Sequence, residues 1–246
     1  MANWNEPQTR RSGFGTSPTF ADGTAARGYD AGLRKHMLSI YNYMASGVLL
    51  TGVVALLMAR SGMAAAMVGS PVMWLVILAP LAIVFAMSFG QGRFSTGTLQ
   101  AMFWGFAVLM GASLSTIFLV YTGQSIATTF FATAAAFAGL SLVGYTTKKD
   151  LSGMGTFLTM GVIGILIAMV INLFVQSTAL QMGISILGVL IFAGLTAYDT
   201  QMLKRQYAVV AGTEFAGKAV IMGALSLYLD FINMFQFLLS FLGSRD

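Results

Sequence analysis

Two carboxylates inside apolar sequence are the residues best suited to chemistry in this chain. Of the 8 Asp and Glu residues, only Asp199, in GLTAYDTQM, and Asp230, in ALSLYLDFINMF, lie within long hydrophobic segments. An ionised carboxylate is costly in hydrocarbon, so each must face a protein interior, a partner or water. Because the two acids fall in the last two apolar segments, we expect them to form one buried acidic site.

Polar residues accompany both acids at helical spacing. Ser226, Asp230 and Asn233 follow one another at steps of four and three, which places them on one face of a helix. Thr196 and Thr200 form a similar short patch around Asp199. A helix that faced lipid on all sides would not carry such a face. The last segment is therefore predicted to be central, with its polar face turned inward.

Several uses of a buried carboxylate pair remain open. The pair could share a proton and sense pH, because two adjacent carboxylates do not easily both ionise. It could pass Ca²⁺ transiently, since the chain offers fewer oxygens than the six to eight ligands of a tight site. It could activate water as in aspartyl intramembrane proteases, but LYLDF around Asp230 lacks the GxGD glycines of those enzymes. We therefore expect no enzyme. The two acids could also be satisfied separately, with no shared role.

Geometry sets a condition on the pair. Asp199 lies near the end of its apolar segment and Asp230 near the middle of its own, so their depths could differ by roughly 10 Å. They meet only if the sixth helix extends past Met202, or if the seventh begins late or shifts. Arg93, in FGQGRFSTG after the second apolar segment, could pair with Asp199. The same position equally suits an ordinary basic flank of a membrane helix.

Composition places the chain in a membrane. It is 57% hydrophobic and only 9% charged, whereas soluble proteins carry about 25% charged residues. Cys is absent, which excludes disulfides and thiolate metal sites. The net charge of +5 falls in loops rather than along a basic stripe, so nucleic-acid binding is not predicted.

Seven segments are long enough to cross about 30 Å of hydrocarbon, which takes about 20 helical residues. Their apolar runs are continuous rather than alternating, which favours helices over barrel strands. The fold class predicted is an all-α integral membrane protein, a seven-transmembrane-helix bundle with a central C-terminal helix. The predicted spans are 39–59, 72–90, 99–121, 125–147, 152–175, 180–202 and 219–242.

The chain divides into a tail and a membrane domain. Residues 1–32 are polar and Gly-rich without an apolar period, so they are predicted to be a disordered cytoplasmic tail, and 33–246 the seven-helix domain. All of the 13 Lys and Arg residues except Arg60 and Arg245 fall on one side of the bundle. This places the N-terminus in the cytoplasm and the C-terminus outside, unless the seventh segment is re-entrant.

The runs GLTAYDTQ and ALSLYLDFINMFQFLL, with YNYMASGVLLTGVVA and KKDLSGMG, resemble the Bax inhibitor-1 family, also called the transmembrane Bax inhibitor motif family. The resemblance covers about residues 33–242. It implies passive, pH-sensitive Ca²⁺ leak, with Asp199 and Asp230 as pH sensor and transient calcium ligands. It implies that Arg93 latches Asp199, although the basic cluster of some members is missing. The polar residues of the two acidic faces would then support the ion pathway.

The resemblance also implies the setting. We expect a multi-pass protein of a bacterial inner (plasma) membrane, with calcium as permeant ion and no cofactor. Other bacterial members are linked to a membrane-bound AAA protease, and eukaryotic relatives suppress cell death. The alternative function is therefore a non-channel regulator of such a protease.

Overall fold

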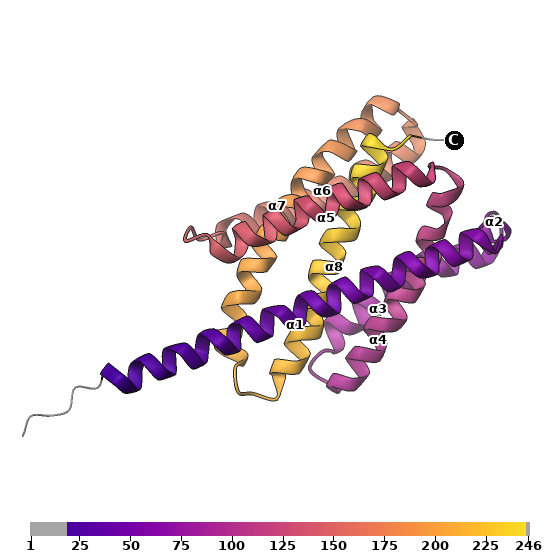
Figure 1. Cartoon of the computed structure of the whole chain (residues 1–246). Coiled ribbons are helices and arrows are strands. Elements are labelled where there is room, and N and C mark those ends of the chain that lie inside the picture. The colour runs from indigo at the N-terminus through magenta and orange to yellow at the C-terminus, as the bar shows by residue number, and fades with distance from the viewer. Residues whose placement is uncertain (1–18, 245–246) are drawn as a thin grey trace, which may run out of the picture.

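The computed structural model describes the backbone of residues 19–244 and the side chains of residues 28–244. Over this part of the chain it contains helices and no strands (Figure 1). The helices are α1 (Thr19–Arg60), α2 (Met63–Met67), α3 (Pro71–Gly90), α4 (Thr96–Leu114), the 3₁₀ turn η1 (Ser115–Leu119), α5 (Gly123–Thr146), α6 (Ser152–Val175), α7 (Thr178–Val210) and α8 (Phe215–Leu242).

The seven predicted spans are confirmed as helices long and apolar enough to cross a membrane. The third combines α4 with η1. The first and sixth exceed their predicted lengths most: Gly28–Arg60 and Thr178–Val210 each have 33 residues, well above the roughly 20 that hydrocarbon requires. Helix α7 passes Met202 without a break and ends two residues before Gly212, whose φ of 74° suits glycine. The condition on the acid pair is thus met by the longer sixth span.

The start of α1 differs from the sequence prediction. Helix α1 begins at Thr19, so residues 19–32 are helical where a disordered tail was expected, while residues 1–18 lie outside the described part. Extending an existing helix costs less than nucleating one, so the membrane span can propagate into its flank. Tertiary contact adds to this: Tyr29 packs on Tyr207 with ring centroids 5.3 Å apart. Gly32 lies directly against the Tyr207 hydroxyl, so a side chain at position 32 would displace this tyrosine.

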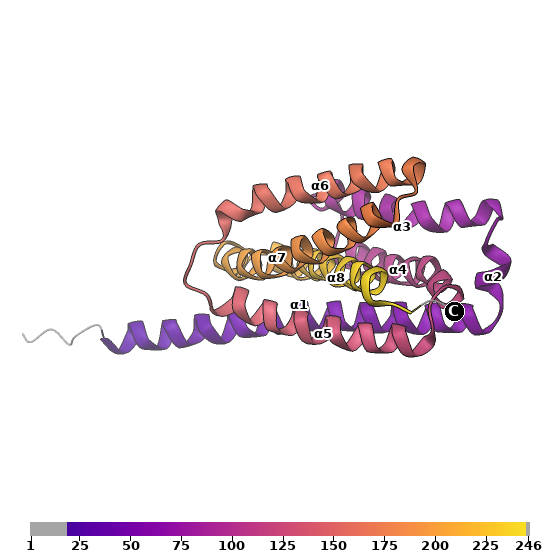
Figure 2. The same cartoon turned by 90° about the horizontal axis from the view of Figure 1, so that it is seen from above.

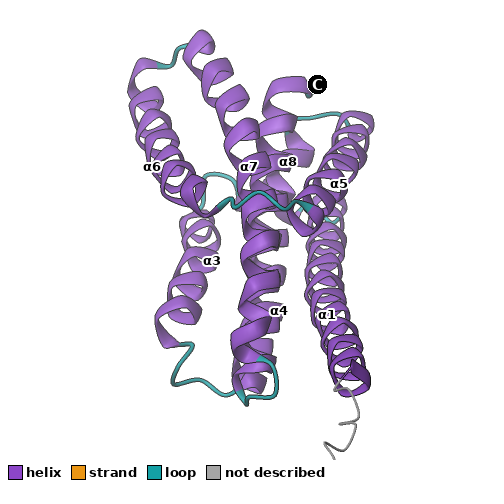
Figure 3. Cartoon of the chain, turned by 90° about the vertical axis from the view of Figure 1, so that its left-hand side faces the viewer, coloured by secondary structure: helices purple, strands orange, loops and turns teal. Residues whose placement is uncertain are grey.

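The spans form three layers, seen in Figures 2 and 3. Helices α3 and α6 form one outer layer, α4, α7 and α8 the middle layer, and α1 and α5 the other outer layer. Helix α8 is the most enclosed: 56% of an apolar 18-residue stretch of this helix is buried, against 11% for the corresponding stretch of α6. The prediction of a central C-terminal helix is confirmed.

A hydrogen-bonded cluster joins α1, α4 and α8 within this core. The Thr51 hydroxyl donates to the carbonyl of Ala107 at 2.8 Å, and it lies 2.6 Å from the Tyr228 hydroxyl. Phe103 and Phe106 pack edge-on against the Tyr228 ring. All five residues are buried. Within a membrane no water is present to bond these hydroxyls, so they must bond to each other or to the backbone. The bond of Tyr228 to Thr51 also holds α8 in place two residues from Asp230.

Candidate functional site: a buried carboxylate pair between two helices

Close packing of α7 against α8 fixes their register. Ser185 donates to Ser240 at 3.0 Å. A Cβ on Gly188 would lie 2.5 Å from the Phe237 ring, and one on Gly223 would lie 2.7 Å from the Leu203 side chain. Small residues at such points let membrane helices approach closely.

This antiparallel register decides the depth of the two acids. It sets Asp230 near the level of Thr196 and Asp199 near the level of Ser226, so the acids are about one helical turn apart along the seam. One turn rises about 5 Å, half of the difference that the sequence suggested. At this separation the charge of Asp199 is close enough to act on Asp230.

Asp230 is the more enclosed of the two. Its side chain is 4% exposed, and its Oδ2 has no hydrogen-bond partner. Asp199 is half-buried on α7. Among the described residues, the ion pair present joins Arg205 to Asp150, and neither buried acid has a basic partner. An unpaired carboxylate in such a place is costly, so Asp230 does not stabilise the fold.

Three of the four accompanying polar residues form hydrogen bonds elsewhere. Thr196 donates to the carbonyl of Phe192 in its own helix at 2.8 Å. Thr200 donates to Ser141 of α5 at 3.3 Å. Asn233 donates to the carbonyl of Leu229 at 2.8 Å, and Ser226 is half-buried. None of these hydrogen bonds joins the polar side chains to Asp199 or Asp230.

Arg93 does not contact the acids in this arrangement. It lies exposed in the turn between α3 and α4, and within the described residues it makes no ion pair. The latch on Asp199 therefore stays a prediction for another conformation.

The described residues offer no preformed metal cage. No group of three or more His, Cys, Asp or Glu side chains lies together among them. Ca²⁺ takes six to eight oxygens, so two carboxylates alone do not make a tight calcium site.

A polar clamp holds the α5–α6 turn against α7 just beyond Asp199. Gln201 donates to the carbonyl of Lys149 at 2.8 Å and accepts from the backbone N–H of Leu151 at 2.9 Å. Arg205 pairs with Asp150 at 2.7 Å. Hydrogen bonds from Ser152, with the nearby Arg205, lower the pKa of Asp150 to about 2. This clamp gives the KKDLSGMG turn a structural role that its spacing alone did not indicate.

These features define a class: a seven-helix membrane bundle with a central last helix and a carboxylate pair between its last two helices. The family model described as inhibitor of apoptosis-promoting Bax1 matches residues 33–246. The chain belongs to this family, the Bax inhibitor-1 family.

Bacterial relatives match along nearly their whole length. The chain is 47% identical over 229 residues to an uncharacterised protein of Caulobacter vibrioides, covering 88% of this chain and 91% of the relative. It is 44% identical over 227 residues to an uncharacterised protein of Rickettsia prowazekii, covering 88% and 92%. It is 43% identical over 219 residues to the inner membrane protein YbhL of Escherichia coli K12, covering 87% and 94%.

Proposed function

We propose that this protein is a passive, pH-sensitive Ca²⁺ leak pathway in which Asp199 and Asp230 sense pH and contact the ion. The observation that carries the proposal is the unpartnered Oδ2 of Asp230, buried beside a second carboxylate in the central seam. Family membership adds the expectation of calcium leak. The sparse oxygen set favours a leak over a tight site.

The pair provides a physical basis for pH sensitivity. Two ionised carboxylates one turn apart repel each other, and the low-dielectric surroundings strengthen that repulsion. A proton on either acid removes it. Protonation therefore changes both the force between α7 and α8 and the attraction for a cation. If Arg93 reaches Asp199 in another conformation, ionisation would instead favour that closed pairing.

The setting is part of the proposal. The name of the Escherichia coli relative supports a bacterial inner membrane. The distribution of Lys and Arg supports a cytoplasmic N-terminus and an external C-terminus.

The test is Ca²⁺ flux into liposomes that contain a calcium dye, measured between pH 5 and pH 8. Ca²⁺ influx should be faster with wild-type protein than into empty liposomes, and its rate should change with pH. Asp199→Asn and Asp230→Asn should each flatten that response, and the double variant should resemble the singles because coupled groups are not additive. Asp150→Asn is the matched control, since it neutralises an exposed loop acid engaged by Arg205. Influx equal to empty liposomes at every pH would refute the leak.

A second candidate is regulation of a membrane-bound AAA protease without a channel. It is favoured by α1, which projects beyond the bundle as a helix that a partner could reach (Figure 1). Truncation should remove residues 1–27, which include the first turns of α1, and should stop before Tyr29 because this residue packs on Tyr207. If the truncated chain keeps its leak but loses control of proteolysis, both functions exist. If full-length protein controls proteolysis and shows no leak, the regulator replaces the channel.

A further inference from the structure

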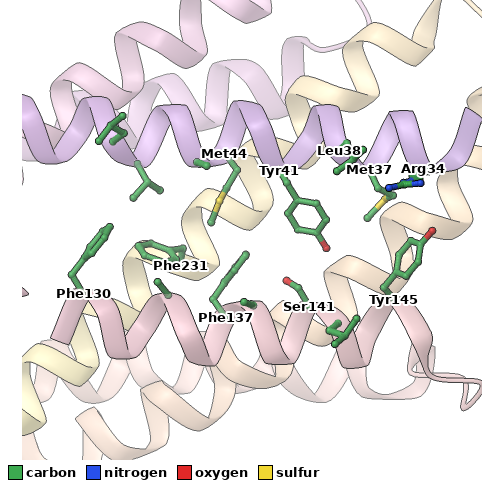
Figure 4. Close-up of a pocket in the computed structure, with 16 residues that line it drawn as sticks. Arg34, Met37, Leu38, Tyr41, Met44, Phe130, Phe137, Ser141, Tyr145 and Phe231 are labelled. Atoms are coloured by element: carbon green, nitrogen blue, oxygen red, sulfur yellow. The ribbon is translucent and has the colours of Figure 1, made fainter. Parts of the chain in front are cut away.

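An apolar groove runs between α1 and α5, with α8 as its floor (Figure 4). Its volume is about 760 Å³, within the range of small-molecule sites. A second cavity of about 300 Å³ continues along the same helices, and both are lined by Val48 and Phe130. Helices α1 and α5 each pack on α8 but not extensively on each other. The groove is therefore a lengthwise gap in the outer layer.

The groove has the length and lining of an acyl-chain site. On α1 it extends from Arg34 to Leu49, which at 1.5 Å per residue is about 22 Å. Half of the hydrocarbon core is about 15 Å, so the groove can take one chain from one leaflet. Met44, Phe137 and Phe231 extend into it, as Figure 4 shows. Large side chains on facing helices keep α1 and α5 apart and leave an apolar surface that must be covered.

One end of the groove is polar and positively charged. Arg34 on α1 faces Tyr145 on α5 there (Figure 4). Lys204 of α7 adjoins the same tyrosine, since its Nζ donates to the Tyr145 carbonyl at 2.8 Å and lies 5.0 Å from the ring centroid. The lysine ammonium has three donors, so two remain for another ligand.

No acid forms an ion pair with Arg34 or Lys204 among residues 28–244. No carboxylate lines the cavity. Asp150 of the neighbouring loop is engaged by Arg205, and across residues 28–244 no ion pair joins Arg34 to Asp30, one turn before it on α1. Two cations therefore flank the end of an apolar groove without a protein counter-ion.

We propose that the groove binds one anionic glycerophospholipid of the surrounding bilayer. One acyl chain lies between α1 and α5 over Phe231, and the phosphate lies between Arg34 and Lys204. Basic pockets between transmembrane helices select anionic headgroups, and tyrosines favour the headgroup level. A second copy of the chain is the poorer occupant, because it would bring the same cations to this end.

The headgroup is tested by native mass spectrometry of the full chain, supplied with equal amounts of phosphatidylglycerol and phosphatidylcholine carrying the same acyl chains. Wild-type protein should retain phosphatidylglycerol preferentially. Each of Arg34→Gln and Lys204→Gln should lower that preference about fivefold, the size expected for one cation near a lipid surface. Lys218→Gln is the control, because Lys218 lies at the start of α8 and does not line the groove. Equal retention of both lipids by wild type, or an unchanged preference in the double variant, would overturn the headgroup assignment.

The groove itself is tested by filling it. Ala138 lines the groove, so Ala138→Phe should abolish retention of both lipids. Ala136 is exposed on the same helix and does not line the groove, so Ala136→Phe should retain lipid as wild type does. Thermal unfolding confirms that both variants fold, and Ala45→Phe fills the groove from α1 if Ala138→Phe does not. Lipid retained by both groove variants, or a lipid-free dimer in place of bound lipid, would overturn the proposal.

Discussion

The two sides of α8 are built in opposite ways. Toward α7 the contact is closed: Gly188 and Gly223 admit large side chains from the facing helix, and Ser185 bonds to Ser240. On the opposite side α1 and α5 both pack on α8, but an apolar groove of about 760 Å³ separates these two outer helices from each other.

The difference follows from side-chain size. In lipid no hydrophobic force drives helices together, so packing and hydrogen bonds decide how closely they approach. Small residues on the α7 side allow backbones to come near, whereas Phe130 and Phe137 of α5 and Met44 of α1 hold the other seam apart. The carboxylate pair lies on the closed side, where Asp230 is buried and Asp199 half-buried. One helix thus supports a protected acidic site on one face and lipid access on the other.

The largest effect should come from adding bulk to the closed seam. In Gly188→Leu the new side chain meets Phe237, which cannot easily retreat because it stacks on Phe192 with centroids 5.8 Å apart. Overpacking of this kind costs about 1–3 kcal/mol. Gly139→Leu on α5 is the matched control, because a Cβ there meets no atom within 4 Å. Unfolding in detergent mixtures gives both free energies, and equal losses would show that the α7–α8 seam is not closely packed.

Removing the buried acid should stabilise the fold while it removes the pH response. Asp230→Leu replaces an unpartnered oxygen with apolar atoms of similar size. Leaving a buried polar atom unsatisfied costs about 1–3 kcal/mol, so the free energy of unfolding should rise by a similar amount. Asp150→Leu, at an exposed loop acid, should give no such gain. Thermal unfolding of both variants separates the outcomes, and a destabilised Asp230→Leu would mean that the acid is a structural residue.

The hydrogen bond between Ser185 and Ser240 across the closed seam should contribute less to the free energy of unfolding. A double-mutant cycle with Ser185→Ala and Ser240→Ala should give a coupling energy of about 0.6 kcal/mol, the average for hydrogen bonds between membrane helices. Ser39 bonds only within α1, so a cycle of Ser39→Ala with Ser240→Ala should give none. Coupling that is no larger for the first cycle would mean that shape alone fixes the register.

The smallest change in stability should come from the clamp outside the membrane, where Asp150 pairs with Arg205. The pKa of Asp150 is lowered to about 2 by hydrogen bonds from Ser152 and the nearby Arg205. A pKa lowered by folding contributes stability that is complete above about pH 4 and is lost as pH falls toward 2. The unfolding temperature of wild type should therefore fall slightly over that range relative to Asp150→Asn. The pair is exposed, so the difference is small. A difference that does not change between pH 5 and pH 2 would contradict the clamp.

The sequence determined the elements and the residues worth testing. Seven apolar runs had to become helices, because hydrocarbon leaves the backbone no other partner within a segment. Asp199 and Asp230 were recognisable because charge inside such a run is rare. The inward face of the last helix followed from the spacing of Ser226, Asp230 and Asn233, and α8 is indeed the most buried span.

Tertiary structure decided where those elements meet. The level of Asp199 relative to Asp230 depends on how Gly188, Gly223 and Ser185 fit the facing helix. The exposed place of Arg93 depends on the turn after α3, and the early start of α1 is accompanied by the contact of Tyr29 with Tyr207. The groove arises because two helices share a floor without packing closely on each other. Hydropathy and helical spacing are properties of one segment, whereas register and gaps depend on the shapes of two or three segments in contact.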